Sequence, residues 1–122
     1  MNGLERNNRL RFPRTCRLRH RTDFTHVIKQ GIRFTFQQGR IYYIPNNVSF
    51  SRFAVSVSRK TGNAVQRNRL KRICREAFRC NRPYLIKGYD IIIICYKPFI
   101  ANTNAITRLL QKAGLFGINS EK

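Results

Sequence analysis

Apolar residues recur along the chain at two spacings, and the helical spacing comes first. Phe24, Val27 and Ile28 stand at positions i, i+3 and i+4, which places them on one face of an α-helix. Thr22 or Asp23 can cap the start of this helix, because both side chains accept hydrogen bonds from free backbone N–H groups. The pattern therefore predicts a short amphipathic helix that ends at the following glycine.

The next segment is rich in aromatic and β-branched residues, a composition typical of β-structure. Residues 33–44 predict one long strand, with either a bulge at Gly39 or a split there into two strands. Residues 52–60 predict another strand, because apolar and small residues alternate there with the two-residue period of a pleated sheet. The apolar face holds Phe53, Val55 and Val57, and the small face holds Ala54, Ser56 and Ser58.

Residues 63–81 combine helical periodicity with strong positive charge. Asn63 can cap this helix with Gln66 as its capping-box partner, and Pro83 follows its end. The apolar residues share one side of the helix and most basic residues share the other, so the helix is amphipathic. The apolar side holds Leu70, Ile73, Cys74, Ala77 and Phe78, and the polar side holds Asn68, Lys71, Arg72, Arg75 and Arg79.

The four isoleucines of Ile91–Ile94 form a short apolar run, which predicts a central strand buried on both faces. A last helix is predicted over residues 102–113. The order α–β–β–α–β–α, with a further strand if the long one splits, predicts a single-domain α+β sandwich. Residues 17–116 would form this domain, preceded by a flexible basic arm over residues 1–16 and followed by a tail over residues 117–122.

The chain carries a formal net charge of +20 and has a pI of about 11.4. Such an imbalance favours a polyanionic partner, with nucleic acid ahead of an anionic membrane surface. The longest apolar run is far shorter than the roughly 20 residues that span a bilayer, and no secretory signal follows the basic N-terminus. We therefore expect a cytoplasmic protein that binds nucleic acid and no membrane.

The basic helix lacks the acidic neighbours of an ordinary solvent-exposed face. From Lys60 to Arg79 there are seven Lys and Arg residues and one acid, Glu76. Like charges at helical spacing repel by about a few tenths of a kcal/mol per pair, so the stripe indicates an anionic ligand. Arginine outnumbers lysine there, which favours two-pronged contacts with phosphate. Gly62 and Asn63 would also leave free backbone N–H groups at the helix N-terminus.

Other chemistry is weakly indicated. The four cysteines contain no C-x-x-C pair, so they predict small buried or half-buried thiols rather than a zinc site or disulfides. His20 and His26 have no carboxylate or metal cluster nearby in sequence that would tune a general base. The five acids are scattered, which argues against a protein-only nuclease that holds metal ions.

The stretch SRKTGNAVQRNRLKRICREAFR, residues 58–79, resembles the signature of the bacterial ribonuclease P protein subunit. Its centre is Arg67, Asn68 and Arg69. The resemblance extends to RLRHRTDFTHVIKQG and FAVSVSRK on the N-terminal side and to DIIIICYKP on the C-terminal side, so that it covers residues 17–113.

This resemblance implies a single α+β domain whose strand–signature helix–strand connection is left-handed, against the usual right-handed rule. It implies that the partners are ribonuclease P RNA and precursor tRNA, whose 5′ leader the complex removes by endonucleolytic cleavage. The RNA would carry out the phosphodiester hydrolysis with magnesium ions (Mg2+) that it mainly holds. The protein would then be a monomeric subunit with no catalytic residue and no tightly bound metal.

The resemblance also implies two groups of RNA-binding residues. The signature helix would contact the catalytic RNA, while the first helix and the sheet would form a cleft for the leader, whose bases stack on aromatic rings. Ile28 stands where the family often has a second aromatic, one turn after Phe24. The catalytic-RNA group is Lys60, Asn63, Arg67, Asn68, Arg69, Lys71, Arg72 and Arg75, and the leader group is Phe24, Ile28, Tyr42, Ala54, Ser56 and Ser58.

Two alternatives remain open at this point. A ribosomal-type structural RNA-binding protein would be equally basic, because phosphate contacts dominate the affinity in both cases. Phe24 and Tyr42 would fit an apolar core as well as a stacking surface, and only the resemblance favours the second role.

Overall fold

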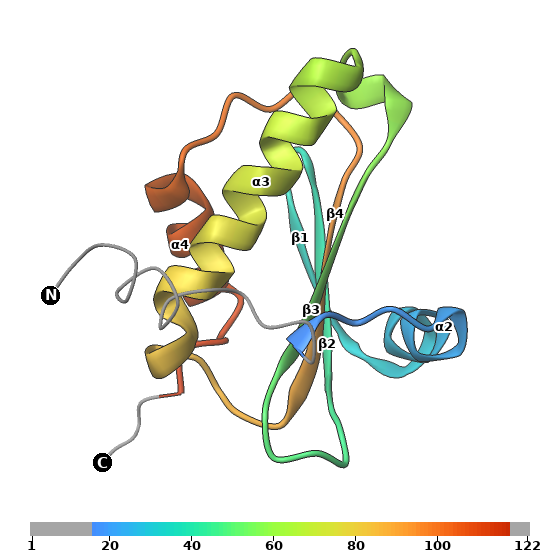
Figure 1. The fold of residues 1–122 in the computed structure, drawn as a ribbon, viewed down its shortest axis with the longest axis vertical. Coiled ribbons are helices and arrows are strands. Elements are labelled where there is room, and N and C mark those ends of the chain that lie inside the picture. The colour runs from blue at the N-terminus through green and yellow to red at the C-terminus, as the bar shows by residue number, and fades with distance from the viewer. Residues whose placement is uncertain (1–15, 118–122) are drawn as a thin grey trace, which may run out of the picture.

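A four-stranded sheet with helices on both faces forms the centre of the protein (Figure 1). The computed structural model describes residues 16–117. The predicted arm and tail lie outside this range except for Cys16 and Gly117, so that division of the chain stays a prediction. The helices are α2 (Arg21–Gln30), α3 (Ala64–Asn81) and α4 (Thr103–Lys112), the strands are β1 (Ile32–Phe36), β2 (Gly39–Pro45), β3 (Arg52–Val57) and β4 (Tyr89–Cys95), and the short 3₁₀ segments η2 (Arg59–Thr61) and η3 (Arg82–Tyr84) flank α3.

The isoleucine run forms β4, which lies inside the sheet. The strand order is β1-β2-β4-β3, and β4 is antiparallel to β2 and parallel to β3. Ile91, Ile92 and Ile93 have no exposed area, which confirms the prediction of a strand buried on both faces. Because β3 and β4 are parallel neighbours, the chain must cross over between them, and α3 forms that crossover.

The two faces of the sheet carry different helices. Figure 1 shows α3 and α4 on one side of the strands and α2 on the other. Phe53, Val55 and Val57 belong to the apolar cluster under α3 and α4, where the Phe53 ring stacks on that of Phe78 with centroids 4.6 Å apart. Ala54 belongs to the smaller cluster under α2. The alternation predicted for β3 is therefore confirmed, and its small side chains face the α2 side.

The long strand predicted after α2 is two strands, so the alternative of a split at Gly39 is correct. β1 and β2 form a hairpin in which Phe36 pairs with Gly39, and Gln37 and Gln38 make the turn between them. Gly39 also lies so close to β4 that a Cβ atom on it would collide with the carbonyl oxygen of Ile94. Only glycine therefore fits where β2 begins beside the end of β4.

The start of α2 also differs from the prediction. His20 is the N-cap residue and makes no side-chain hydrogen bond there, so neither Thr22 nor Asp23 caps the helix. Asp23 lies instead in the first turn, where a carboxylate interacts favourably with the helix dipole. The predicted cap at Asn63 is confirmed, and the side chain of Asn102 caps α4 in the same way.

Candidate nucleic-acid interface

A capping box fixes the start of α3. Asn63 Oδ1 accepts a hydrogen bond from the backbone N–H of Gln66 at 2.9 Å, and Gln66 Oε1 accepts one from the backbone N–H of Asn63 at 2.9 Å. Arg67 donates from Nη1 to the carbonyl oxygen of Gly62 at 2.8 Å. Asn63 and Arg67, both predicted to bind RNA, therefore also hold the N-terminal turn of the helix in place.

The solvent-facing side of α3 carries a row of exposed polar and basic side chains. Asn68, Arg72 and Arg75 are exposed and line a shallow cavity of about 360 Å³. The other residues that line it are Arg17, Arg79 and Glu76, whose carboxylate is paired with Arg79. Guanidinium groups that border a common hollow suit a phosphate, because each can donate two parallel hydrogen bonds to its oxygens. We name Arg17, Asn68, Arg72 and Arg75 the α3 row.

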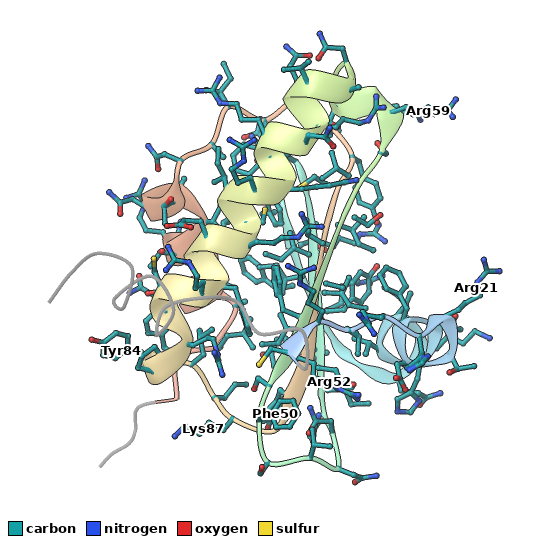
Figure 2. All side chains as sticks on the ribbon, in the orientation of Figure 1. Arg21, Phe50, Arg52, Arg59, Tyr84 and Lys87 are labelled. Atoms are coloured by element: carbon teal, nitrogen blue, oxygen red, sulfur yellow. The ribbon has the colours of Figure 1, made fainter. Side chains whose placement is uncertain are left out.

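The remaining residues predicted for this face lie apart from the α3 row. Arg69 is exposed but lines a different cavity, beside the segment that follows β4. Lys71 is half-buried. Lys60 is exposed on η2, next to Arg59, which projects near the N-terminal end of α3 (Figure 2). Arg17 was not predicted, because its place beside α3 depends on a bridge to Phe53 of β3 that no periodicity reveals.

The α2 side of the sheet brings together four of the six residues predicted for the leader. Phe24 and Ile28 are half-buried on α2 and pack with Tyr42 and Ala54 in one apolar cluster. Tyr42 keeps only 6% of its area exposed. Its ring therefore fills the space between α2 and the sheet, and most of it is covered as the core alternative expected.

The other two leader residues lie further along the sheet. Ser56 is in register with Ile94 of β4, which is in register with Arg40 of β2. Partners in register on neighbouring strands point to the same face, so these residues form a row across the sheet. Ser58 lies beyond β3, and its hydroxyl donates to the carbonyl oxygen of Tyr96 at 3.3 Å. Ser56 thus lies on the sheet face predicted for the leader, whereas the Ser58 hydroxyl has a backbone partner.

Arg40 places a positive charge beside aromatic rings on this face, which sequence reasoning missed. It donates from Nη1 to the Tyr42 hydroxyl at 3.2 Å, and its guanidinium carbon lies 5.6 Å from the centroid of the Tyr96 ring. Burial alone would raise the pKa of Tyr42, but the hydrogen bond and charge of Arg40 lower it overall. The alternation of Arg40 and Tyr42 along β2 could have placed both on this face. Aromatic surface beside a cation is the combination that holds single-stranded nucleic acid.

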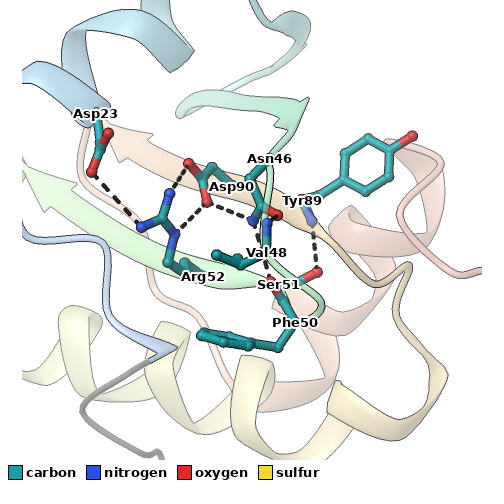
Figure 3. Close-up of polar contacts among 8 residues, drawn as sticks. All are labelled: Asp23, Asn46, Val48, Phe50, Ser51, Arg52, Tyr89 and Asp90. Carbon is teal, nitrogen blue, oxygen red and sulfur yellow. Dashed lines mark hydrogen bonds and ion pairs between the residues drawn. The ribbon is translucent and has the colours of Figure 1, made fainter.

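Arg52 connects α2 to the sheet through two carboxylates (Figure 3). Its Nε and Nη2 atoms donate to the two carboxylate oxygens of Asp90 on β4, each at 2.8 Å. Its Nη1 atom lies 3.8 Å from Oδ2 of Asp23 on α2. Asn46 donates a further hydrogen bond to Asp90 at 2.9 Å. This network holds the first turn of α2 against the strand ends and so orients the helix that carries Phe24.

The acids of the described residues all stand beside arginines. Asp23 and Asp90 pair with Arg52, and Glu76 pairs with Arg79 on α3. Within residues 16–117 no group of three His, Cys, Asp or Glu side chains is placed to hold a metal ion. No helix in the same range has the length and apolar character to cross a membrane.

The predicted burial of the cysteines is correct at three positions and wrong at one. Cys16, Cys74 and Cys95 are buried, whereas Cys80 is exposed near the end of α3. Cys74 lies on the apolar side of that helix, and Cys80 does not. The helical position, rather than the residue type, therefore decides the burial of these two thiols.

Comparisons with known proteins agree on one family. The chain matches the family model described as Ribonuclease P over residues 12–114. It is 35% identical to the ribonuclease P protein component of Clostridium beijerinckii, over 82% of this chain and 90% of that protein. It is 39% identical to that of Petrotoga mobilis, over 78% and 80%.

Solved structures show the same likeness. The Staphylococcus aureus RNase P protein superimposes with a TM-score of 0.73 at 32% identity, covering 84% of this chain and 98% of that one. The Thermotoga maritima RNase P protein gives a TM-score of 0.69 at 33% identity, covering 79% and 92%.

Proposed function

Since this chain belongs to the ribonuclease P protein family, we propose that its two faces bind two different RNA molecules. The chain is a protein subunit of the ribonucleoprotein endonuclease that removes the 5′ leader from precursor tRNA, and it associates with ribonuclease P RNA. This membership sets aside the alternative of a ribosomal-type protein. In the proposal, α3 binds the catalytic RNA and the α2 side of the sheet binds the leader.

The α3 row is the observation that carries the first half of the proposal. Arg72 and Arg75 are exposed around one hollow, and the only acid on the helix is engaged by Arg79. Without an anionic partner these guanidinium groups repel one another, whereas phosphates of a folded RNA would neutralise them and release counterions. Lys60, which lies before the helix on η2, would extend the contact beyond the N-terminal end of α3, and Arg69 would add a contact on a different side of the helix.

The leader half of the proposal rests on Phe24 and Arg40. Phe24 is half-buried beside Ile28, and Arg40 lies among tyrosines in the next row of the sheet. Ala54 and Ser56 are small, so nucleotides could approach the sheet closely there. With Tyr42 nearly covered and an aliphatic residue at position 28, Phe24 is the aromatic to which we assign base stacking.

Cleavage itself we assign to the RNA and its magnesium ions. Asp23, Glu76 and Asp90 are each paired with an arginine, so they do not fit the role of Mg2+ ligands. Magnesium would therefore be held mainly by the RNA, and the protein would contribute binding and orientation rather than a catalytic group. We expect the protein to act as a monomer, because a net charge of +20 opposes self-association. We also expect it to act in the cytoplasm.

Reconstitution tests the proposed function directly. Precursor tRNA and a bacterial ribonuclease P RNA, mixed at low magnesium concentration, should be cleaved accurately at the mature 5′ end only when this protein is added. Cleavage should improve because the cationic side chains of the bound protein supply part of the charge neutralisation that magnesium ions otherwise supply. Tight binding to the RNA without any gain in cleavage would contradict the proposal.

Removal of one guanidinium from the α3 row should weaken assembly with the catalytic RNA. Arg72→Ala is expected to raise the dissociation constant about tenfold, because a charge-assisted hydrogen bond contributes on the order of 1–2 kcal/mol. It should also lower the slope of log affinity against log salt by about one lost phosphate contact. Fluorescence titrations at several salt concentrations measure both quantities.

Arg21→Ala is the matched control for Arg72→Ala. Arg21 is an exposed helical arginine that projects from α2, away from α3 (Figure 2), so its loss removes the same charge from a different face. Its affinity for the catalytic RNA should stay close to that of the unaltered protein. Equal losses in the two variants would show that net charge alone determines binding, against a specific role for the α3 row.

A further inference from the structure

A second cavity lies beside the first half of α3, on a different side from the α3 row. It has a volume of about 340 Å³ and is bounded by the segment that follows β4. Figure 1 shows that segment running beside α3 before it enters α4. Apart from Arg69, none of the side chains that line this cavity belongs to the interface assigned above.

The apolar residues that line the cavity range from buried to fully exposed. Leu70 is buried, Ile73 is half-buried, and Phe99 is half-buried with its ring centroid 6.0 Å from that of Phe36. Ile100 is fully exposed, at 103% of its reference area. A single exposed aliphatic is ordinary on a protein surface. Here, however, it borders an apolar hollow and so enlarges the surface that an apolar ligand could cover.

The surroundings of the cavity are positively charged. Arg69 lines it, exposed Lys60 directly precedes the lining residue Thr61, and exposed Lys97 directly precedes the lining residue Pro98. No acidic residue is among the described residues that line it. A second copy of this chain, with a net charge of +20, would be repelled from such a place. The complementary ligand has an apolar planar body attached to an anionic link, which describes a nucleotide.

We infer that this cavity receives an unpaired base of the catalytic RNA. The base would pack on Phe99 and Ile100, and Arg69 would contact its backbone phosphate. Bases held in this way are bound through their flat faces, so the site would tolerate different bases. This inference rests on the proposed function of α3 as the helix that binds the catalytic RNA, and it adds an anchor that does not depend on charge.

The salt dependence of binding separates an apolar anchor from a phosphate contact. Ile100→Ser is expected to weaken binding of the full-length protein to ribonuclease P RNA by about five- to tenfold. The slope of log affinity against log salt should not change, because an apolar contact releases no counterions. Arg69→Ala, at the same cavity, should lower both the affinity and the slope.

Ile32→Ser is the matched control, because Ile32 on β1 is also exposed, at 57%, and does not line the cavity. It should bind the RNA as tightly as the unaltered protein. If Ile100→Ser binds normally while Arg72→Ala binds weakly, the base site is wrong and the proposed role of α3 stands. If neither variant is weakened, both are wrong.

Crosslinking identifies the occupant. An aryl azide attached to the thiol of an Ile100→Cys variant should react with a small number of unpaired nucleotides of ribonuclease P RNA. The variant needs Cys80→Ser as its background, since Cys80 is exposed and would also be labelled. Crosslinks confined to base-paired segments, or to a second copy of the protein, would overturn the inference.

Discussion

Replacement of Arg52 by alanine is expected to lower the free energy of unfolding by about 3–5 kcal/mol. The reason is Asp90, which has only 4% of its area exposed and would lose both of its 2.8 Å hydrogen bonds from the guanidinium. A buried carboxylate without its partner retains the cost of leaving water, and Asn46 supplies only one hydrogen bond. Urea unfolding followed by circular dichroism measures the change.

Two further variants test whether the loss comes from the Arg52–Asp90 pair. Asp23→Asn removes the more distant partner, which lies 3.8 Å away with 36% of its side chain exposed, and should cost less than about 1 kcal/mol. Arg52→Lys keeps the charge but cannot form the two-pronged contact with Asp90. Its stability should therefore fall between those of Arg52→Ala and Asp23→Asn. If Arg52→Ala were no less stable than Asp23→Asn, Asp90 would not depend on this arginine.

The fold could be predicted where one segment displays its own periodicity. The alternation of β3 and the apolar side of α3 are visible in the sequence because neighbours two, three or four positions apart share an environment. The same periodicity could not decide whether β1 and β2 are one bulged strand or two strands of a hairpin. Its turn, Gln37 and Gln38, lacks the Asn-Gly or Asp-Gly pair typical of tight hairpins, and both strands have similar aromatic composition.

The candidate site divides in the same way. The α3 row follows from helical spacing, apart from Arg17, whose position depends on pairing with β3. Arg52 and Asp90 are 38 positions apart, so their contact depends on the register of two strands, which a single sequence does not specify. The face of Tyr42 was predictable from alternation, but its depth was not, because depth depends on how α2 lies over the sheet.

Loss of the Phe24 ring should weaken leader binding selectively. Phe24→Ala is expected to reduce the affinity of the assembled enzyme for leader-bearing precursor tRNA by about 1–3 kcal/mol, the value of one base stacked on an aromatic ring. Binding of mature tRNA should change little, because the proposed contact is with the leader alone. Dissociation constants for the two RNAs at one salt concentration give the comparison.

Packing must be separated from stacking, since Phe24 shares its cluster with Val27 and Ile92. Phe24→Leu keeps an apolar side chain and removes the flat ring, so it should stay folded and lose the preference for the leader. Val27→Ala cuts a fully buried side chain of the same cluster, so it should lose stability and keep the preference. Equal losses for both RNAs in Phe24→Ala, with normal preference in Phe24→Leu, would make Phe24 a core residue. The leader would then have to be held by Arg40 and the small residues of β3, because Tyr42 is nearly covered.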